Sequence, residues 1–129
     1  MLDFSSGGSS DNVIVANRDV TSTVAFHVNQ EQQWKDLYSS NWEQSEWVHV
    51  VATASGSTMT VFKNGALAGV NEGGHEPLEV ARTQHWLGRS AWESDEFFEG
   101  TIAFVRVWHG VALGQGVVEA LYRERELEH

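Results

Sequence analysis

The sequence predicts an all-β fold in which antiparallel sheets pack into a two-sheet sandwich. Three observations predict it: short stretches of alternating apolar and polar residues, turns rich in glycine and asparagine between them, and 12 glycines against a single proline. Apolar residues make up 41% of the 129 residues and include six tryptophans and six phenylalanines, which is enough to fill a sandwich interior. A single domain is therefore predicted over residues 2–126.

The N-terminal third contains the first predicted strands and the loops around them. Residues 5–11 form a loop rich in serine and glycine. The apolar run 13–16 is a predicted buried strand, and residues 21–28 alternate in the way of a half-buried strand. Polar residues 29–33 form a turn before a short strand at 35–38. The core-facing residues of the alternating strand are Val24, Phe26 and Val28.

The middle of the chain is predicted to form a three-stranded meander. Residues 47–53 are rich in strand-forming residues, and Ser55-Gly56-Ser57 closes them with a tight turn. Residues 58–63 return as the antiparallel partner and end at Asn64-Gly65. This dipeptide is the strongest two-residue hairpin signal, because both positions of a type I′ turn need positive φ. Residues 66–70 then pair back.

The C-terminal third combines two more predicted strands with a short helix. A loop rich in glycine and glutamate leads to a strand at 83–89, and a polar and aromatic loop at 90–99 follows. Residues 100–108 carry apolar side chains on both faces, which predicts a central strand. Apolar residues at spacings of three and four within 115–126 predict an amphipathic helix.

Charge and composition disfavour several classes of partner. The formal net charge is −10 and no basic run occurs, which argues against nucleic acid and anionic membrane surfaces. The chain has no cysteine, so neither a disulfide nor a thiolate site is predicted. No apolar run approaches the roughly 20 residues of a membrane-spanning helix, and no signal peptide opens the chain. Residues 127–129 resemble the start of a purification tag and are left out of the fold prediction.

Five motifs, taken in order, carry a resemblance to a known family. They are Asp3-Phe4 with Asp11-Asn12-Val13, Trp47-Val48-His49-Val50, Val61-Phe62-Lys63-Asn64-Gly65, Trp86-Leu87-Gly88-Arg89-Ser90, and Gly100-Thr101-Ile102 with Val105-Arg106-Val107-Trp108. Their order and intervals resemble the bacterial laminin G-like domains of the concanavalin A-like lectin/glucanase superfamily. The resemblance implies a two-sheet jelly roll whose concave face or edge loops often bind carbohydrate, sometimes with calcium. It also implies an extracellular or cell-surface location.

The chain departs from the family pattern at its N-terminus. Family domains begin with further strands before the Asp-Phe segment, whereas Met1 lies almost on that segment. A jelly roll without those strands leaves a sheet edge or a strip of core bare, and such an edge is a template for pairing. We therefore expect a homo-oligomer through the exposed sheet edge, or completion by a protein partner. The alternatives are that the missing strands are dispensable or that the sequence is a fragment.

Aromatic side chains in loops are the main predicted ligand-binding residues, because an aromatic ring suits the apolar face of a sugar ring. Trp42 and Trp92 lie beside polar residues, where binding and structural roles are both open, and Tyr38 lies close to Trp42 in sequence. The predicted ligand-binding residues are Tyr38, Trp42, Trp92 and Arg89. The tryptophans assigned to the core, because they lie inside strand motifs, are Trp47, Trp86 and Trp108.

Calcium is the one cofactor that the sequence suggests. Hard cations prefer clustered carboxylates and carbonyl oxygens. The candidate ligands are Asp11, Asn12, Asp95 and Glu96, with Asp3 near in sequence. No spacing as definite as that of an EF-hand is present. Calcium titration followed by thermal unfolding tests the prediction, since a ligand of the folded state raises the midpoint temperature of unfolding.

The leading functional interpretation is a non-catalytic, lectin-like module that binds carbohydrate through its loops. A protein-contact, adhesion or assembly domain is the second interpretation, and a glycoside hydrolase is the third. Residues 93–99 resemble the Glu-x-Asp-x-(x)-Glu signature of glucanases with this fold. The last glutamate of the segment comes one residue late, however, so Glu93 and Glu99 are not assigned as catalytic residues.

Overall fold

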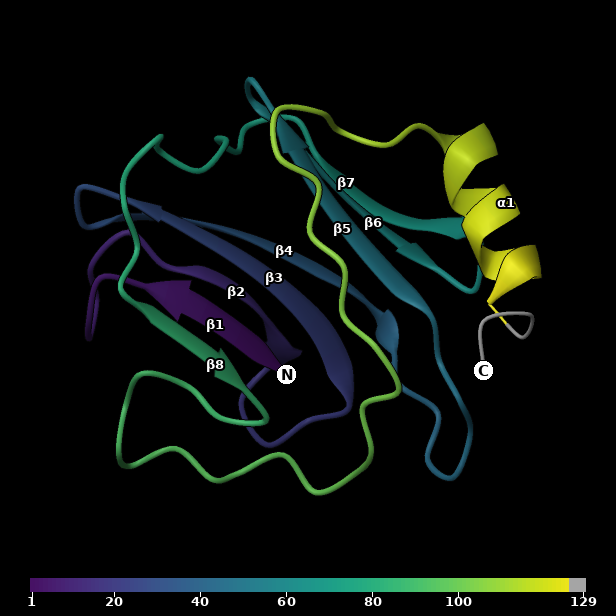
Figure 1. Cartoon of the computed structure of the whole chain (residues 1–129), viewed down its shortest axis with the longest axis horizontal. Helices are drawn as coiled ribbons and strands as arrows, with labels where there is room; N and C mark the ends of the chain where they lie inside the picture. The colour runs from purple at the N-terminus through teal and green to yellow at the C-terminus, as the bar shows by residue number, and fades with distance from the viewer. Residues whose placement is uncertain (126–129) are drawn as a thin grey trace.

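Two antiparallel sheets and one short helix make up the computed structural model, which describes residues 1–125 (Figure 1). The five-stranded sheet has the order β4-β3-β2-β1-β8 and consists of β1 (Leu2–Ser5), β2 (Val13–Asn17), β3 (Thr23–Gln30), β4 (Gln33–Asn41) and β8 (Gln84–Leu87). The three-stranded sheet consists of β5 (Val50–Ser55), β6 (Thr58–Lys63) and β7 (Ala66–Asn71). The helix is α1 (Gln115–Glu124). The predicted all-β sandwich with a short C-terminal helix is confirmed.

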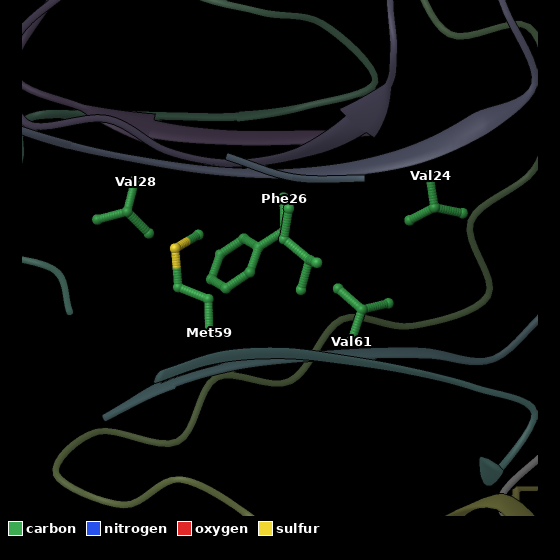
Figure 2. Close-up of a cluster of buried hydrophobic side chains, with 6 residues drawn as sticks. Val24, Phe26, Val28, Met59 and Val61 are labelled. Atoms are coloured by element: carbon green, nitrogen blue, oxygen red, sulfur yellow. The ribbon is translucent and has the colours of Figure 1, made fainter. Parts of the chain in front are cut away.

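The alternation of residues 21–28 positions one face of β3 in the core, as predicted. Val24 and Val28 have no exposed surface and Phe26 is 3% exposed. From β6, Met59 and Val61 approach the same space, and all five side chains lie between the two sheets in Figure 2. Because side chains alternate across a strand, the residues between them on β3 belong to the opposite, outer face of the five-stranded sheet.

The meander forms as predicted, with Asn64 and Gly65 as the β6–β7 turn. Their φ angles are 51° and 81°, the positive values that a type I′ turn requires. The first strand of the meander starts later than predicted, at Val50. Trp47 therefore precedes the strand and is 68% exposed, so its assignment to the core was wrong.

Helix α1 covers the outer face of the three-stranded sheet. Val118 of the helix has no exposed surface and packs with Val51 of β5 and Phe62 of β6. Leu113, just before the helix, packs against the same cluster. The helix ends at Glu124, slightly before the predicted end, while Glu126 and the predicted tag residues 127–129 lie outside the described residues.

The predicted central strand at residues 100–108 is wrong. No strand is assigned there; the ring of Phe104 lies 6.3 Å from that of His49, which places the segment beside the start of β5. Apolar side chains on both faces of a segment indicate an extended backbone. A central strand also needs a neighbouring strand on each side with which to form hydrogen bonds. Exposure is correspondingly high, at 68% for Val107 and 41% for Trp108, so the core assignment of Trp108 was also wrong.

Candidate functional site

A broad groove with a volume of about 1430 Å³ lies over the outer face of the five-stranded sheet. Its floor includes Ile14 of β2, His27 of β3 and Asp36 of β4, which are paired across the sheet. Three loops contribute walls: residues 17–22, residues 42–47 and residues 90–101. The groove exceeds the roughly 300–1,000 Å³ of ordinary small-molecule pockets, so it has room for an extended ligand.

Aromatic rings from the sheet and from a loop meet in this groove. The ring centroids of Trp34 on β4 and Trp92 in the 90–101 loop are 6.0 Å apart, with a 42° angle between the planes. His27 stands beside Trp34, with ring centroids 6.4 Å apart, and its Nδ1 lies 2.6 Å from Oδ1 of Asp36. The pairing of His27 with Asp36 fixes the imidazole next to Trp34, so the rings of His27, Trp34 and Trp92 form a continuous aromatic patch in the groove.

The loop that carries Trp92 is held by a buried carboxylate. Asp3 of β1 has no exposed surface, and its Oδ2 accepts a hydrogen bond of 2.8 Å from the backbone N–H of Ala91. Its Oδ1 accepts a second bond, of 3.1 Å, from Nδ2 of Asn12. Burial raises the pKa of Asp3, these two hydrogen bonds lower it, and the nearby charge of Asp95 raises it further. Asp3 therefore positions the wall of the groove at some electrostatic cost.

Within the same loop, Ser90 connects the two ends of a short turn. Its hydroxyl donates to Oδ2 of Asp95 at 2.6 Å and accepts a hydrogen bond from the backbone N–H of Trp92 at 3.1 Å. The backbone N–H of Asp95 also donates to the carbonyl oxygen of Trp92, at 3.2 Å. These bonds order the loop that presents the Trp92 ring to the groove.

Acidic side chains dominate the charged part of the groove lining. Among the described residues, the lining includes seven carboxylates and no lysine or arginine; the carboxylates are Asp19, Asp36, Glu43, Glu46, Asp95, Glu96 and Glu99. Lys63, which is outside the lining, places its Nζ 2.6 Å from Oε1 of Glu43 and lowers the pKa of that carboxyl. Met1 also lines the groove, and burial lowers the pKa of its α-amino group, which disfavours a positive charge there.

The four predicted ligand-binding residues are not brought together. Trp42 and Trp92 both line the groove, but Trp42 also packs against the hydrophobic core. Tyr38 is not in a loop: it lies on β4, 43% exposed, with the Arg18 guanidinium 4.3 Å from its ring centroid. Arg89 stacks on Trp86 at 4.2 Å and is not part of the lining. Trp86 of β8 is paired with Asp3 of β1, and both lie on the outer face of the five-stranded sheet. Trp86 is therefore outside the core to which it was assigned.

The predicted calcium ligands do not form one cluster. Among residues 1–125, no three acidic or imidazole side chains are arranged to hold a metal ion. Asp95 and Glu96 line the groove, whereas Asn12 is buried and donates to Asp3 and to the carbonyl oxygen of Gly8. Asp11 lies next to Asn12, and Nε of Arg82 donates to its backbone oxygen. This donor set does not fit a single calcium ion, and calcium binding stays a prediction.

The two glutamates of the glucanase-like segment differ in position. Glu99 lines the groove, and Glu93, which is exposed, does not. Retaining glycosidases need two carboxyl groups about 5–5.5 Å apart on either side of the scissile bond. The positions of Glu93 and Glu99 give no such pair across the groove.

Trp34, His27 and Asp36 were not predicted from the sequence as site residues. Part of the signal was present in the sequence, because the alternation along residues 21–28 assigns His27 to one face of its strand. A strand that continues through Trp34 likewise places Trp34 and Asp36 on one face of β4. The predicted strand at 35–38 was too short, since β4 spans Gln33–Asn41, so Trp34 fell between the predicted turn at 29–33 and this strand and was assigned to neither. The pairing of β3 with β4 is what brings the three side chains together.

Two packed antiparallel sheets with an aromatic groove on the outer face define a β-sandwich of the jelly-roll type. The chain belongs to the concanavalin A-like lectin/glucanases superfamily, whose family model matches residues 2–117. This confirms the resemblance seen in the sequence. Because the name of the superfamily covers both lectins and glucanases, membership leaves binding and hydrolysis both open. Among curated proteins, none matches the chain.

A solved structure shares this fold. It is a crystal structure of an S-layer domain-containing protein from Clostridium thermocellum, 22% identical, with a TM-score of 0.57. The match covers 95% of this chain and 61% of that chain, so the present chain spans about three fifths of its length. At this identity the likeness shows the fold alone.

In the described part of the chain, no helix is long and apolar enough to cross a membrane.

Proposed function

We propose that this domain is a non-catalytic carbohydrate-binding module whose binding site is the groove on the outer face of the five-stranded sheet. The observation that carries the proposal is the pair of tryptophans, Trp34 and Trp92, with rings 6.0 Å apart in an open groove. Flat indole surfaces pack against the apolar faces of sugar rings, and surrounding carboxylates accept hydrogen bonds from sugar hydroxyls. A groove of this size suits several sugar units in a row.

Removing either indole should weaken glycan binding about ten-fold or more. An aromatic side chain that buries its face against ligand contributes roughly 1.5–3 kcal/mol, equivalent to about 10–100-fold in affinity. We expect Trp34→Ala and Trp92→Ala to lose binding, measured by calorimetry with the best ligand from a glycan array. Trp34→Phe, which keeps a flat ring, should retain most of it.

The matched control is Trp108→Ala, because Trp108 is 41% exposed and does not line the groove. Its affinity should stay within about two-fold of the parent. Equal losses in the groove variants and in Trp108→Ala would contradict the assignment, as would an array on which no glycan binds. Circular dichroism of each variant checks that the fold is retained.

A second candidate function, protein contact, is favoured by exposed apolar side chains outside the groove. Leu87 of β8, on the edge strand of the larger sheet, is 53% exposed, and Val107 and Val111 are 68% and 59% exposed. Edge strands with apolar side chains pair readily with other chains. We propose a homo-oligomer formed through the β8 edge.

The solution mass tests this second function. We expect a dimer or larger species in analytical ultracentrifugation at high protein concentration. Leu87→Lys should shift the mass toward the monomer, because a charged side chain on an edge strand disfavours pairing with another chain. Val20→Lys is the matched control, since Val20 is fully exposed and distant in sequence from β8. A parent protein that stays monomeric would rule out the homo-oligomer.

An extracellular or cell-surface location accompanies this proposal. It is supported by the superfamily and by the structural likeness to an S-layer domain-containing protein. A neutral or basic ligand outside the cell agrees with the net charge of −10.

A further inference from the structure

We propose that the groove selects cationic sugars, that is, oligosaccharides whose rings carry free amino groups. This inference rests on the proposed carbohydrate-binding function and adds the charge of the ligand. The binding site is inferred from the groove and its paired indoles. The carboxylates around the indoles determine which sugar binds most tightly.

Three of the seven acidic side chains of the groove have a side-chain partner among residues 1–125. Glu43 is paired with Lys63, Asp36 with His27, and Asp95 accepts from the Ser90 hydroxyl. The remaining four lining carboxylates have no ion pair or side-chain hydrogen bond with any of residues 1–125; they are Asp19, Glu46, Glu96 and Glu99. A concave surface lined by charges of one sign concentrates ligands of the other sign.

A neutral sugar would leave the mutual repulsion of these carboxylates in place, because hydroxyl groups donate hydrogen bonds without changing the charge. A protonated amino group supplies both the hydrogen bonds and the positive charge. An acidic sugar would be repelled for the same reason. The geometry therefore ranks amino sugars first, neutral sugars second and uronic acids last.

The aromatic floor argues for a sugar polymer over a basic peptide. Trp34 and Trp92 both line the groove, and the flat ring of each needs a flat apolar partner. In a polymer of amino sugars, each unit offers such a face together with an amino group at its edge. Stacking on the floor and charge pairing at the walls would then occur in the same sugar unit.

The test compares three oligosaccharides of equal length with the same β-1,4 linkage: glucosamine oligomers, their fully N-acetylated forms, and cello-oligosaccharides. All three are measured at the same pH, about 6. We expect the glucosamine oligomer to bind at least about ten-fold more tightly than the other two. This advantage should shrink as salt is raised toward about 1 M, where the Debye length falls to roughly 3 Å.

Charge variants show whether the groove is responsible. Glu96→Gln combined with Glu99→Gln should weaken binding of the glucosamine oligomer by about two- to five-fold per carboxylate, and leave the cello-oligosaccharide unchanged. The control is Glu72→Gln combined with Glu79→Gln, which removes the same charge from exposed positions outside the lining. That control should leave all three affinities unchanged.

The possible outcomes separate this inference from the proposed function. Equal binding of all three oligosaccharides, lost in Trp34→Ala, overturns the charge selectivity and leaves carbohydrate binding intact. Absence of binding to every oligosaccharide overturns both. Equal weakening by the control pair, or tighter binding of a lysine oligomer than of the glucosamine oligomer, also overturns the inference, because charge alone would then explain the binding.

Discussion

Replacing Phe26 by alanine should lower the free energy of unfolding by about 3–5 kcal/mol. Phe26 is 3% exposed and lies between the sheets, with Val24 and Val28 beside it on β3 and Met59 and Val61 opposite (Figure 2). Losing the ring removes its apolar contacts and leaves a cavity that strands on both sides are too constrained to close. Urea unfolding followed by tryptophan fluorescence measures the change.

Phe97→Ala is the matched control, because it makes the same chemical change at a side chain that is 73% exposed. Its unfolding free energy should change by no more than about 0.5 kcal/mol. A loss at Phe26 that is no larger than the loss at Phe97 would mean that the space between the sheets is not the core that stabilises the fold.

The parts of the fold that the sequence predicted are those determined by local chemistry. Val24, Phe26 and Val28 alternate at the strand period, so the core face of β3 follows from the sequence itself. Asn64-Gly65 determines its turn in the same way, because few other dipeptides tolerate two positive φ angles.

The parts that could not be predicted depend on pairing between distant segments. Residues 100–108 have the pattern of a strand, yet whether they join a sheet depends on an available edge, which no local pattern encodes. The groove poses the same problem. Trp34 and Trp92 are separated by 58 positions in sequence, and they meet because β4 lies in the sheet under the loop that Asp3 holds. Aromatic residues in loops were a useful signal for Trp92 but could not find Trp34.

Removing the carboxylate of Asp3 should have the second largest effect on stability. In Asp3→Ala, the backbone N–H of Ala91 and the side-chain amide of Asn12 each lose an acceptor in a buried environment. Unsatisfied buried donors of this kind cost roughly 1–3 kcal/mol each, so we expect a net loss of about 2–4 kcal/mol, partly offset because the desolvation cost of the ionised carboxylate disappears. Glycan affinity should fall as well, since the Ala91 bond holds the loop that carries Trp92.

The pH dependence of stability distinguishes the cost of burying Asp3 from the gain of its hydrogen bonds. Burial raises the pKa of Asp3 above its ordinary value of 3.8, so the folded protein holds this proton more tightly than the unfolded chain. The contribution of Asp3 to the free energy of unfolding therefore falls as pH rises from about 3.8 through the folded-state pKa, and is constant above it. Asp3→Asn has no such titration. The stability of the parent minus that of Asp3→Asn, measured by urea unfolding across this range, should thus decrease with rising pH. An increase would mean that the bonds from Ala91 and Asn12 outweigh burial, and that the ionised carboxylate is favoured by the fold.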